Sequence, residues 1–551
     1  MQIYPVKGDK SIPLDNPSGV CYDKHSVKAM RNKGFIFATL FFALVSTPAW
    51  EGDAWTLSMN KISAIFDLID QHYFETVDHE ELAFSSIKGM LQTLDPHSYF
   101  LDPRHFDRVR EEYKGKYYGL GILIQKQDKR LVVISPVDGG PAYRLGIRSG
   151  DVISHIEGES TEPISSTEAM MKLRGPKDTE VTITIVREGW EKPFDVKIVR
   201  EEIALYSVQY AFILQDDIGY IRIRNFAETT TREFEEKMTM LREQGMEKLI
   251  LDLRNNGGGT FVQSIELSDE FLPQGTLVVS IKGRNQYLDR KYFAEKNDQY
   301  EKIPLVILID GASASAPEIL SGAVKDNDRG LIVGQDSWGK GLVQTIVPLA
   351  PNAAVALTTA KYYTPSGRSI QRDYSNFEDY YLYRKETPED QREVTYTAAG
   401  RKVLGQGGIA PDYKVEFPFD RLVYDLLLKG NFFTYAKKFV EKKRPVSADF
   451  IFPGDNGSKD DTSGKKVIDQ DFVVGEEVIG DFKAYLHEEK FEFEEEKYTE
   501  AEHEISRWLE REIHSALWGV DMGIKAYQKT DPAVLKALEV FPEAVALVKE
   551  K

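Results

Sequence analysis

The sequence predicts a multidomain α+β protein, with a layered α/β core, a smaller strand-rich domain and helical regions at both ends. At 551 residues the chain is too long for a single hydrophobic core. Between 219 and 412, strand-like apolar runs alternate with helical segments, which is typical of a layered α/β domain. Short β-type runs fill 115–200, and apolar residues recur at helical spacing on either side of these regions.

The composition excludes several classes of function. A formal charge of −18 repels phosphate backbones, so nucleic acid is not an expected partner. No His and Cys residues cluster with the spacing of metal ligands. We therefore expect neither a metal nor another cofactor.

An export signal is indicated at the N-terminus. Basic residues precede an apolar stretch at 34–45, and the small residues STPA follow it. This order is typical of a secretory signal peptide, and the apolar stretch is short for a membrane span. We predict a signal peptide with an N-terminal extension over 1–49, with Met30 as an alternative initiator; the alternative interpretation is an uncleaved membrane anchor. Both interpretations place the rest of the chain in the periplasm or cell envelope, and cleavage would remove the single cysteine, Cys21.

Helical periodicity predicts a helical domain at 50–114 and a mainly helical region at 416–551. In the C-terminal region we find no residues that indicate chemistry. The N-terminal region closes on the turn LDPHS at 94–98. His97 in this turn has no acid or nucleophile in a matching local pattern, so it is expected to be a turn or packing histidine.

Residues 115–200 resemble a PDZ domain. The segment GIRSGDVI at 146–153 is similar to the GL-x-x-GD-x-I signature of that family. Such domains bind an extended peptide as an added strand and hold its terminal carboxylate on backbone N–H groups. A glycine-rich segment before the first strand would supply these groups; the alternative is a glycine turn that opens the strand. The residues expected to bind substrate are therefore Gly119, Leu120 and Gly121.

Within the α/β region at 201–415, a serine stands where a strand ends and a helix begins. The segment GASASAPEI at 311–319 places Ser315 at this point, near the positive end of the helix. The position suits a nucleophile, because charge that develops on the attacked carbonyl is favoured there and the N–H of Ala316 is a natural oxyanion donor. The alternative is a capping box, in which Ser315 and Glu318 only close the helix.

A lysine in a glycine-flanked loop favours the catalytic alternative. In GKGLVQ at 339–344, Lys340 must be desolvated to act as a base, because the ordinary lysine pKa is about 10.4. Gln344 shares a face with Lys340 in an extended strand and can orient the amine. In DLRNNGGG at 252–259, the glycines would bring a second oxyanion N–H, that of Gly258, to the reacting carbonyl. The alternative, a phosphate loop, lacks the GK[ST] that would follow it.

Five motifs in one order resemble the carboxyl-terminal processing (tail-specific) protease family. They are DLRNNGGG at 252–259, SASAPEI at 313–319, GKGLVQ at 339–344, YYTPSGRSIQ at 362–371 and GGIAPD at 407–412. The resemblance implies a ClpP/crotonase-like α/β protease core with an inserted PDZ-like domain and a serine–lysine dyad. In this dyad Ser315 is the nucleophile, Lys340 is the base and Gln344 supports the lysine.

The resemblance also carries over to residues outside the dyad. It gives Asp326 a structural or supporting role. It also adds Arg174, in the segment LRGP, to the substrate-binding residues and links it to signalling between the PDZ domain and the protease. Two positions depart from the family pattern, because Gly257 replaces a proline and Pro317 replaces a serine. Glycine at 257 loosens the oxyanion loop, whereas proline is well tolerated in a first helical turn.

The function that this resemblance implies is that of a secreted serine endopeptidase. Its substrates would be unfolded or C-terminally exposed proteins, docked by their C-termini in the PDZ domain and cleaved through an acyl-enzyme. An adaptor protein and a homo-oligomer are left open as partners. One alternative is a catalytically inactive PDZ scaffold or hydrophobic-ligand-binding protein on the same fold. Another is a hydrolase whose nucleophile is Ser313.

Overall fold

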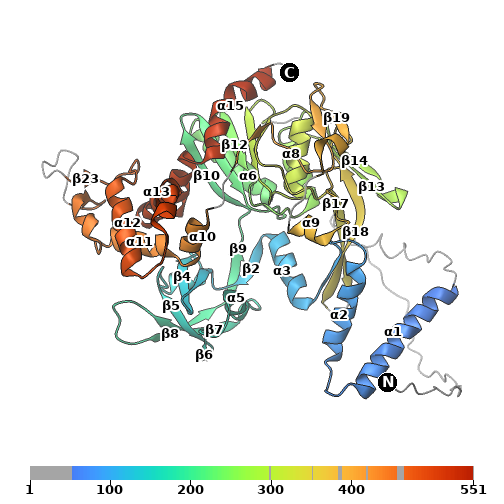
Figure 1. The fold of residues 1–551 in the computed structure, drawn as a ribbon, viewed down its shortest axis with the longest axis horizontal. Helices are drawn as coiled ribbons and strands as arrows, with labels where there is room; N and C mark the ends of the chain where they lie inside the picture. The colour runs from blue at the N-terminus through green and yellow to red at the C-terminus, as the bar shows by residue number, and fades with distance from the viewer. Residues whose placement is uncertain are drawn as a thin grey trace, which may run out of the picture. The chain divides into compact units, whose positions relative to one another are not determined.

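The computed structural model describes residues 52–296, 300–349, 352–382, 387–416, 420–455 and 465–549. The signal peptide or anchor predicted over 1–49 lies outside the described residues. Within the described ranges, no helix is both long and apolar enough to cross a lipid bilayer. Helices and strands are labelled along the chain in Figure 1.

The chain forms two compact units that divide after Leu82. In the first unit the structure describes α1 (Gly52–His72) and the start of α2 (His79–Gln92). His79 Nε2 bonds the carboxylate of Asp70 at 2.6 Å. The predicted helical character of the N-terminal region is thus confirmed.

The second unit begins with the rest of α2 and with two elements of the predicted helical N-terminal region. The helix α3 (Pro103–Lys114) starts at the N-cap Asp102, whose carboxylate accepts from His105 N–H. The strand β1 (Tyr99–Leu101) was not predicted, and it pairs with β18 (Ala353–Tyr363), which belongs to a sheet beside the α/β core. Phe100 and Leu101 are buried in this pairing. Three residues are too few for a period of two to stand out from a helical pattern.

The PDZ-like region is a sheet with the strand order β3-β4-β5-β7-β8, in which β6 pairs with β5. Its strands are β3 (Ile122–Gln127), β4 (Arg130–Pro136), β5 (Val152–Ile156), β6 (Glu159–Ser160), β7 (Glu180–Val186) and β8 (Phe194–Val199). Val181, Ile183 and Ile185 of β7 are fully buried while their neighbours face outward, as a half-buried strand requires. The short α4 (Pro141–Arg144) and α5 (Ser166–Leu173) complete the domain. β3 lies at one edge of this sheet, and among the described residues it pairs only with β4.

An antiparallel pair joins this region to the core. It consists of β2 (Lys116–Gly119) and β9 (Glu201–Ala204). The chain thus enters and leaves the PDZ-like domain at one place, which is what an inserted domain requires. The predicted fold class, a multidomain α+β protein with an inserted PDZ-like domain, is confirmed.

The α/β core is a six-stranded sheet with the order β10-β11-β12-β15-β16-β21. Its strands are β10 (Val208–Gln215), β11 (Ile218–Ile223), β12 (Lys248–Asp252), β15 (Leu305–Ile309), β16 (Leu331–Gly334) and β21 (Tyr413–Lys414). All neighbours from β11 onward pair in parallel, and β10 is the antiparallel edge. Every residue of β15 is buried, because helices cover both faces of the sheet.

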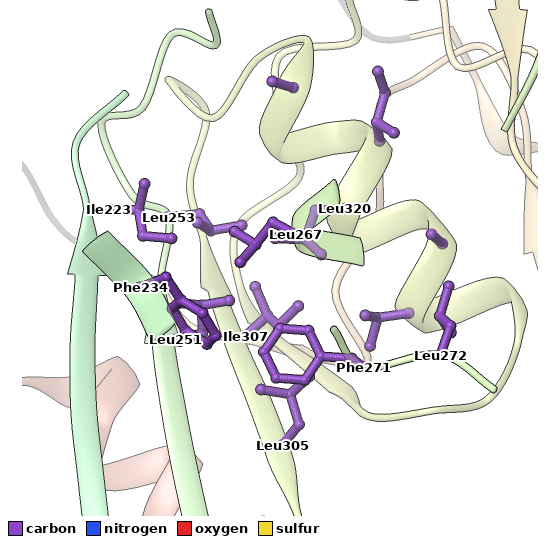
Figure 2. Packing of buried hydrophobic residues seen from close by; sticks show 14 of the residues in the cluster. Ile223, Phe234, Leu251, Leu253, Leu267, Phe271, Leu272, Leu305, Ile307 and Leu320 are labelled. Atoms are coloured by element: carbon purple, nitrogen blue, oxygen red, sulfur yellow. The ribbon is translucent and has the colours of Figure 1, made fainter. Parts of the chain in front are cut away.

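One face of the sheet is covered by α6 (Thr230–Glu243), α7 (Phe261–Asp269) and α8 (Ala316–Asp326). Figure 2 shows this packing, which includes Ile223, Leu251, Leu305 and Ile307 from the strands, Phe234, Leu267 and Leu320 from the helices, and Leu253 and Phe271 from the segments that follow β12 and α7. The layer fixes where α8 begins, and therefore where the serine motif lies.

The opposite face of the sheet is covered by the last helix, α15 (Pro532–Lys549). Val534, Ala537 and Phe541 of this helix are buried in one cluster with Tyr220, Ile250, Val306 and Leu308 of the strands. The C-terminal helix is therefore a layer of the α/β core. Helical periodicity predicted the helix but could not predict the surface that it covers.

A second sheet lies beside the core, with the order β1-β18-β13-β14 and with β17 paired to β18. Its further strands are β13 (Leu277–Gly283), β14 (Arg290–Phe293), β17 (Leu342–Leu349) and β18 (Ala353–Tyr363). The lysine loop leads directly into β17. A register shift between Val343 and Gln344 interrupts the pairing of β17 with β18, and the extra residue, Thr359, lies in β18.

The remaining C-terminal region is a helical layer around an aromatic core. Its helices are α10 (Arg421–Leu428), α11 (Asn431–Val440), α12 (Glu476–Glu488), α13 (Glu495–Trp518) and α14 (Val520–Lys529). Phe432, Tyr435, Phe439 and Phe482 are buried at its centre. The predicted helical character of this region is confirmed.

Candidate active site

Ser315 is the N-cap of α8, and its capping box with Glu318 is formed. Its backbone N–H donates to Glu318 Oε2 at 2.7 Å. An ordinary N-cap has β-region dihedral angles, but Ser315 has φ 64° and ψ −107°. Such a backbone costs a non-glycine residue about 1–3 kcal/mol and persists only where the surroundings enforce it. Capping alone does not account for this strain, since a cap needs no positive φ.

Ser313, the alternative nucleophile, is fully buried. Its hydroxyl donates to the carbonyl of Leu253 at 2.9 Å and accepts from the N–H of Asp310 at 3.0 Å. Ser315 is partly exposed. A substrate can thus approach Ser315, whereas the hydroxyl of Ser313 serves the turn.

Glu318 connects the serine motif to the lysine motif. Besides Ser315 N–H, its Oε2 accepts from the backbone N–H of Lys340 at 3.0 Å, and its Oε1 accepts from the N–H of Gly339 at 2.6 Å. The backbone nitrogens of Ser315 and Lys340 both bond Oε2, so the distance between them cannot exceed the sum of these two hydrogen-bond lengths. The sequence predicted Glu318 only as a capping residue, because nothing local in the chain relates it to a loop some twenty residues on.

The side chain of Lys340 is directed by Gln344, because Nζ donates to Oε1 of Gln344 at 2.6 Å. Gln344 in turn donates through Nε2 to the carbonyl of His97. Burial lowers the pKa of Lys340, while the nearby charges of Glu318 and Asp95 raise it to a smaller extent. A lysine with a lowered pKa is the kind that serves as a general base.

His97 lies next to this pair, although no local pattern pointed to it. Its Nε2 bonds the hydroxyl of Tyr380 at 2.7 Å, and Tyr380 also accepts from the indole N–H of Trp338 at 3.1 Å. Burial, and after it the charge of Lys340, lower the pKa of His97 to about 4. His97 is thus a neutral, buried, hydrogen-bonded histidine, and its neighbours come from segments more than two hundred residues away.

Gly258 lies against Ser315. A Cβ added at Gly258 would come within 3.0 Å of both Ser315 Cβ and the carbonyl oxygen of Ala314, and its φ is +106°, so only glycine fits. The N–H of Gly258, which the sequence analysis assigns to the oxyanion, here donates to Asn256 Oδ1 at 2.9 Å. An asparagine side chain readily bonds the N–H two residues on, so this donor is engaged in the resting structure. The other expected donor, Ala316, is the first residue of α8.

The predicted PDZ residues lie together at the start of the domain. Gly119 ends β2, Leu120 is buried, and Gly121 has φ +67°. The side chain of Arg174 comes within 3.6 Å of a Cβ placed at Gly119. Arg174 pairs with Glu111 of α3 at 2.8 Å and lies 4.3 Å from the ring centroid of Tyr117, so it is held in place.

Asp326, at the end of α8, has a structural environment. Its carboxylate bonds Arg368 at 2.8 Å and the hydroxyl of Ser366 at 2.6 Å, and both Asp326 and Arg368 are buried. These bonds hold the YYTPSGRSIQ segment on α8. In the described part of the chain, no three His, Cys, Asp or Glu side chains gather in a way that could hold a metal ion.

The fold and these motifs define a multidomain α+β protease with an inserted PDZ domain. Family models match at 217–375 (peptidase family S41), at 109–186 (PDZ domain) and at 45–104 (activating protease CtpB N-terminal domain). A carboxy-terminal-processing protease of Bartonella bacilliformis is 40% identical over 311 residues, which cover 56% of this chain and 71% of that protein. The chain therefore belongs to the carboxy-terminal-processing proteases of peptidase family S41.

Two further relatives have lower identity. A probable CtpA-like serine protease of Staphylococcus aureus is 33% identical over 318 residues, which cover 57% of this chain and 62% of that protein. The solved structure of a photosystem II D1 C-terminal processing protease is 28% identical and covers 66% of this chain and 87% of that one, with a TM-score of 0.36. The two alignments leave a large part of this chain unmatched.

Proposed function

We propose that this protein is an exported serine endopeptidase that binds the C-termini of its substrates and cleaves them with Ser315 and Lys340. The observation that carries the proposal is the shared carboxylate of Glu318, which bonds the backbone N–H groups of both residues. It holds a strained, accessible serine beside a desolvated lysine. Both features support a serine–lysine dyad, in which the amine has to reach the serine hydroxyl.

The dyad would work in two steps. Neutral Lys340 accepts the hydroxyl proton of Ser315 as its Oγ attacks the scissile carbonyl, and then gives that proton to the leaving amine. Water next attacks the ester that forms on Ser315, with Lys340 again as the base, and releases the second product. Gln344 accepts one N–H of the amine, which leaves the lone pair of Nζ free to turn toward the hydroxyl.

The oxyanion would be held by the N–H groups of Ala316 and Gly258. The first lies at the N-terminus of α8, where the helix dipole favours negative charge. The second bonds Asn256 in the resting structure, so the oxyanion has to share or replace that bond. A loop that includes Gly257 in place of proline has the freedom to make this adjustment.

Substrate selection would be the task of the PDZ domain. An extended peptide would add to the edge strand β3, with its terminal carboxylate at Gly119, Leu120 and Gly121. Arg174, beside Gly119 and bonded to α3, would relay binding to the protease. An adaptor protein, assembly into a homo-oligomer and a location in the periplasm or cell envelope belong to the same proposal.

The test is cleavage of an unfolded protein with an apolar C-terminus by wild type, Ser315→Ala and Ser313→Ala. We expect wild type and Ser313→Ala to cleave and Ser315→Ala to be inactive. Lys340→Arg should also be inactive, because a guanidinium does not lose its proton near neutral pH. Cleavage by Ser315→Ala at the wild-type rate would refute the proposed nucleophile, and a wild type without activity would favour a binding protein on the same fold.

A further inference from the structure

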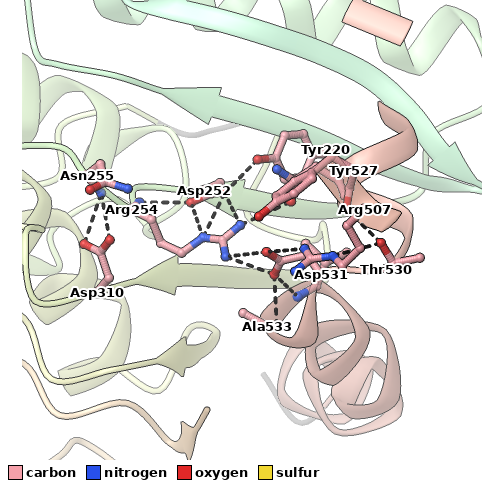
Figure 3. A network of polar contacts seen from close by, with 12 residues as sticks. Tyr220, Asp252, Arg254, Asn255, Asp310, Arg507, Tyr527, Thr530, Asp531 and Ala533 are labelled. Atoms are coloured by element: carbon pink, nitrogen blue, oxygen red, sulfur yellow. Dashed lines mark hydrogen bonds and ion pairs between the residues drawn. The ribbon is translucent and has the colours of Figure 1, made fainter. Parts of the chain in front are cut away.

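Arg254 directly precedes the segment NNGGG at 255–259, called the glycine loop below, and is held between two buried carboxylates (Figure 3). Its Nη1 donates to both oxygens of Asp531 at 2.9 and 3.0 Å, and its Nη2 donates to Asp252 at 2.7 Å. Arg254, Asp252 and Asp531 are each at most 9% exposed. Paired, planar hydrogen bonds on two sides allow a guanidinium only one orientation.

Asp531 comes from the C-terminal region, between α14 and α15, far beyond the S41 match at 217–375. Its Oδ1 also accepts from the N–H groups of Ala533 and Val534 at 3.0 and 3.1 Å, so it starts the helix that covers the core sheet. Gln528 adds a bond to Arg254 Nη2 at 3.2 Å. The position of Asp531 is thereby set by the packing of α15.

The residues after Arg254 transmit this position to the serine. The N–H of Asn255 donates to the carboxylate of Asp310 at 3.0 and 3.1 Å (Figure 3). Asp310 also accepts from the N–H of Ser313. The carbonyl of Asn256 accepts from the N–H of Ala314 at 3.0 Å. The bonds of Asn255 and Asn256 join the glycine loop to the turn that carries Ser315, and the bond between Asp310 and Ser313 lies within that turn.

We infer that Asp531 is a positioning residue for the protease: through Arg254 it holds the glycine loop, and with it Gly258, in place beside Ser315. The C-terminal helices are then part of the catalytic apparatus, although the family match does not extend to them. The inference deepens the proposed function and rests on it. A loop of consecutive glycines has little conformational preference of its own, so an anchor at its start decides where its N–H groups point.

The test is Asp531→Asn in the full chain. Asparagine removes the charge but keeps the oxygen that caps α15, since it is as good an N-cap as aspartate. The readouts are kcat and KM for a peptide substrate and the inhibition constant of a peptidyl boronate, whose adduct with Ser315 resembles the tetrahedral intermediate. We expect kcat and boronate affinity to fall together by about 10–100-fold, because loss of one oxyanion donor typically costs 100–1,000-fold. KM should stay within about twofold, because Asp531 has no role in holding the ground-state peptide.

The matched control is Asp481→Asn. Asp481 pairs with the buried Arg444 at 3.0 Å within the helical layer. Removing its charge disturbs a buried arginine pair of the same kind, and we expect lower stability with kcat and boronate affinity unchanged. If both variants lose activity equally per folded molecule, the positioning role is overturned.

Two measurements keep the outcome clear. Loss of wild-type hydrolysis in Ser315→Ala tests the proposed function separately, so a failure there is distinguishable from a failure of the inference. Should Asp531→Asn not fold, Gln528→Met removes only the bond at 3.2 Å and should lower kcat and boronate affinity in parallel by a few-fold. Unchanged values in that variant overturn the inference as well.

Discussion

Replacing Glu318 with glutamine should weaken the link between the serine and lysine motifs. Glutamine has one acceptor oxygen, so its NH2 group must face one of the two donor pairs. One pair is the hydroxyl of Ser337 and the N–H of Gly339, which donate to Oε1. Placing the NH2 group there costs less free energy, because the hydroxyl of Ser337 can turn and accept from it. Only the N–H of Gly339 then loses its acceptor. A buried donor without a partner costs about 1–3 kcal/mol, and we expect unfolding free energy to fall by that amount.

The same substitution should shift the pH dependence of catalysis. The charge of Glu318 raises the pKa of Lys340 against the larger, opposing effect of burial. Without that charge the pKa of Lys340 falls further, and the base is deprotonated at lower pH. The acid limb of the kcat/KM profile should therefore move to lower pH, although the maximal rate falls because the lysine loop loses the bond at the N–H of Gly339.

The assays are kcat/KM between pH 5 and 10 and urea unfolding of the same preparations. Glu510→Gln is the matched control, since it removes another buried glutamate, which lies in α13. Burial raises the pKa of both glutamates. In the control the acid limb should not move. An acid limb of Glu318→Gln that stays in place, or that moves to higher pH, would refute both the assignment of Lys340 as the base and the electrostatic reasoning.

Two further predictions concern stability. Because the pKa of His97 is lowered to about 4 from an unfolded value near 6.5, stability should decline as pH falls from about 6.5 to about 4, and His97→Gln should flatten this decline in urea unfolding at pH 4.5 and 7. An equal decline in both proteins would contradict the burial of a neutral ring. Phe541→Ala should cost about 3–5 kcal/mol, because the ring is buried between α15 and the core sheet, whereas the exposed Leu535 on the same helix should tolerate alanine within about 0.5 kcal/mol. Equal costs at the two positions, measured by denaturant unfolding, would show that α15 does not pack as described.

Much of the fold could be predicted because its signals are local. The continuous apolar run of β15 and the alternation in β7 depend only on neighbouring residues, and both segments form strands. The family motifs, read in order, correctly identified the protease core and the PDZ domain. The strand β1 was missed, because its pairing partner β18 lies some 250 residues away in the chain.

The candidate active site shows the same contrast between features with local sequence signals and features that depend on distant segments. Ser315, Lys340 and Gln344 were singled out by residue type and spacing, and the bond between Lys340 and Gln344 follows from two residues on one short segment. The engagement of the Gly258 N–H by Asn256 was not foreseen, although the two residues are neighbours, since it depends on the loop conformation. His97 was left outside the site because its partners are distant in the chain.

By itself the sequence determined the chemistry available to this protein: a serine before a helix, a lysine between glycines, and a PDZ signature ahead of both. Only the tertiary structure decided that Glu318 joins the two motifs, that α15 covers the core sheet, and that Asp531 meets Arg254 across 277 residues of chain. The physical reason is that side-chain type and local periodicity are properties of short segments. Burial, charge pairing and loop position depend on which segments the packed fold brings together.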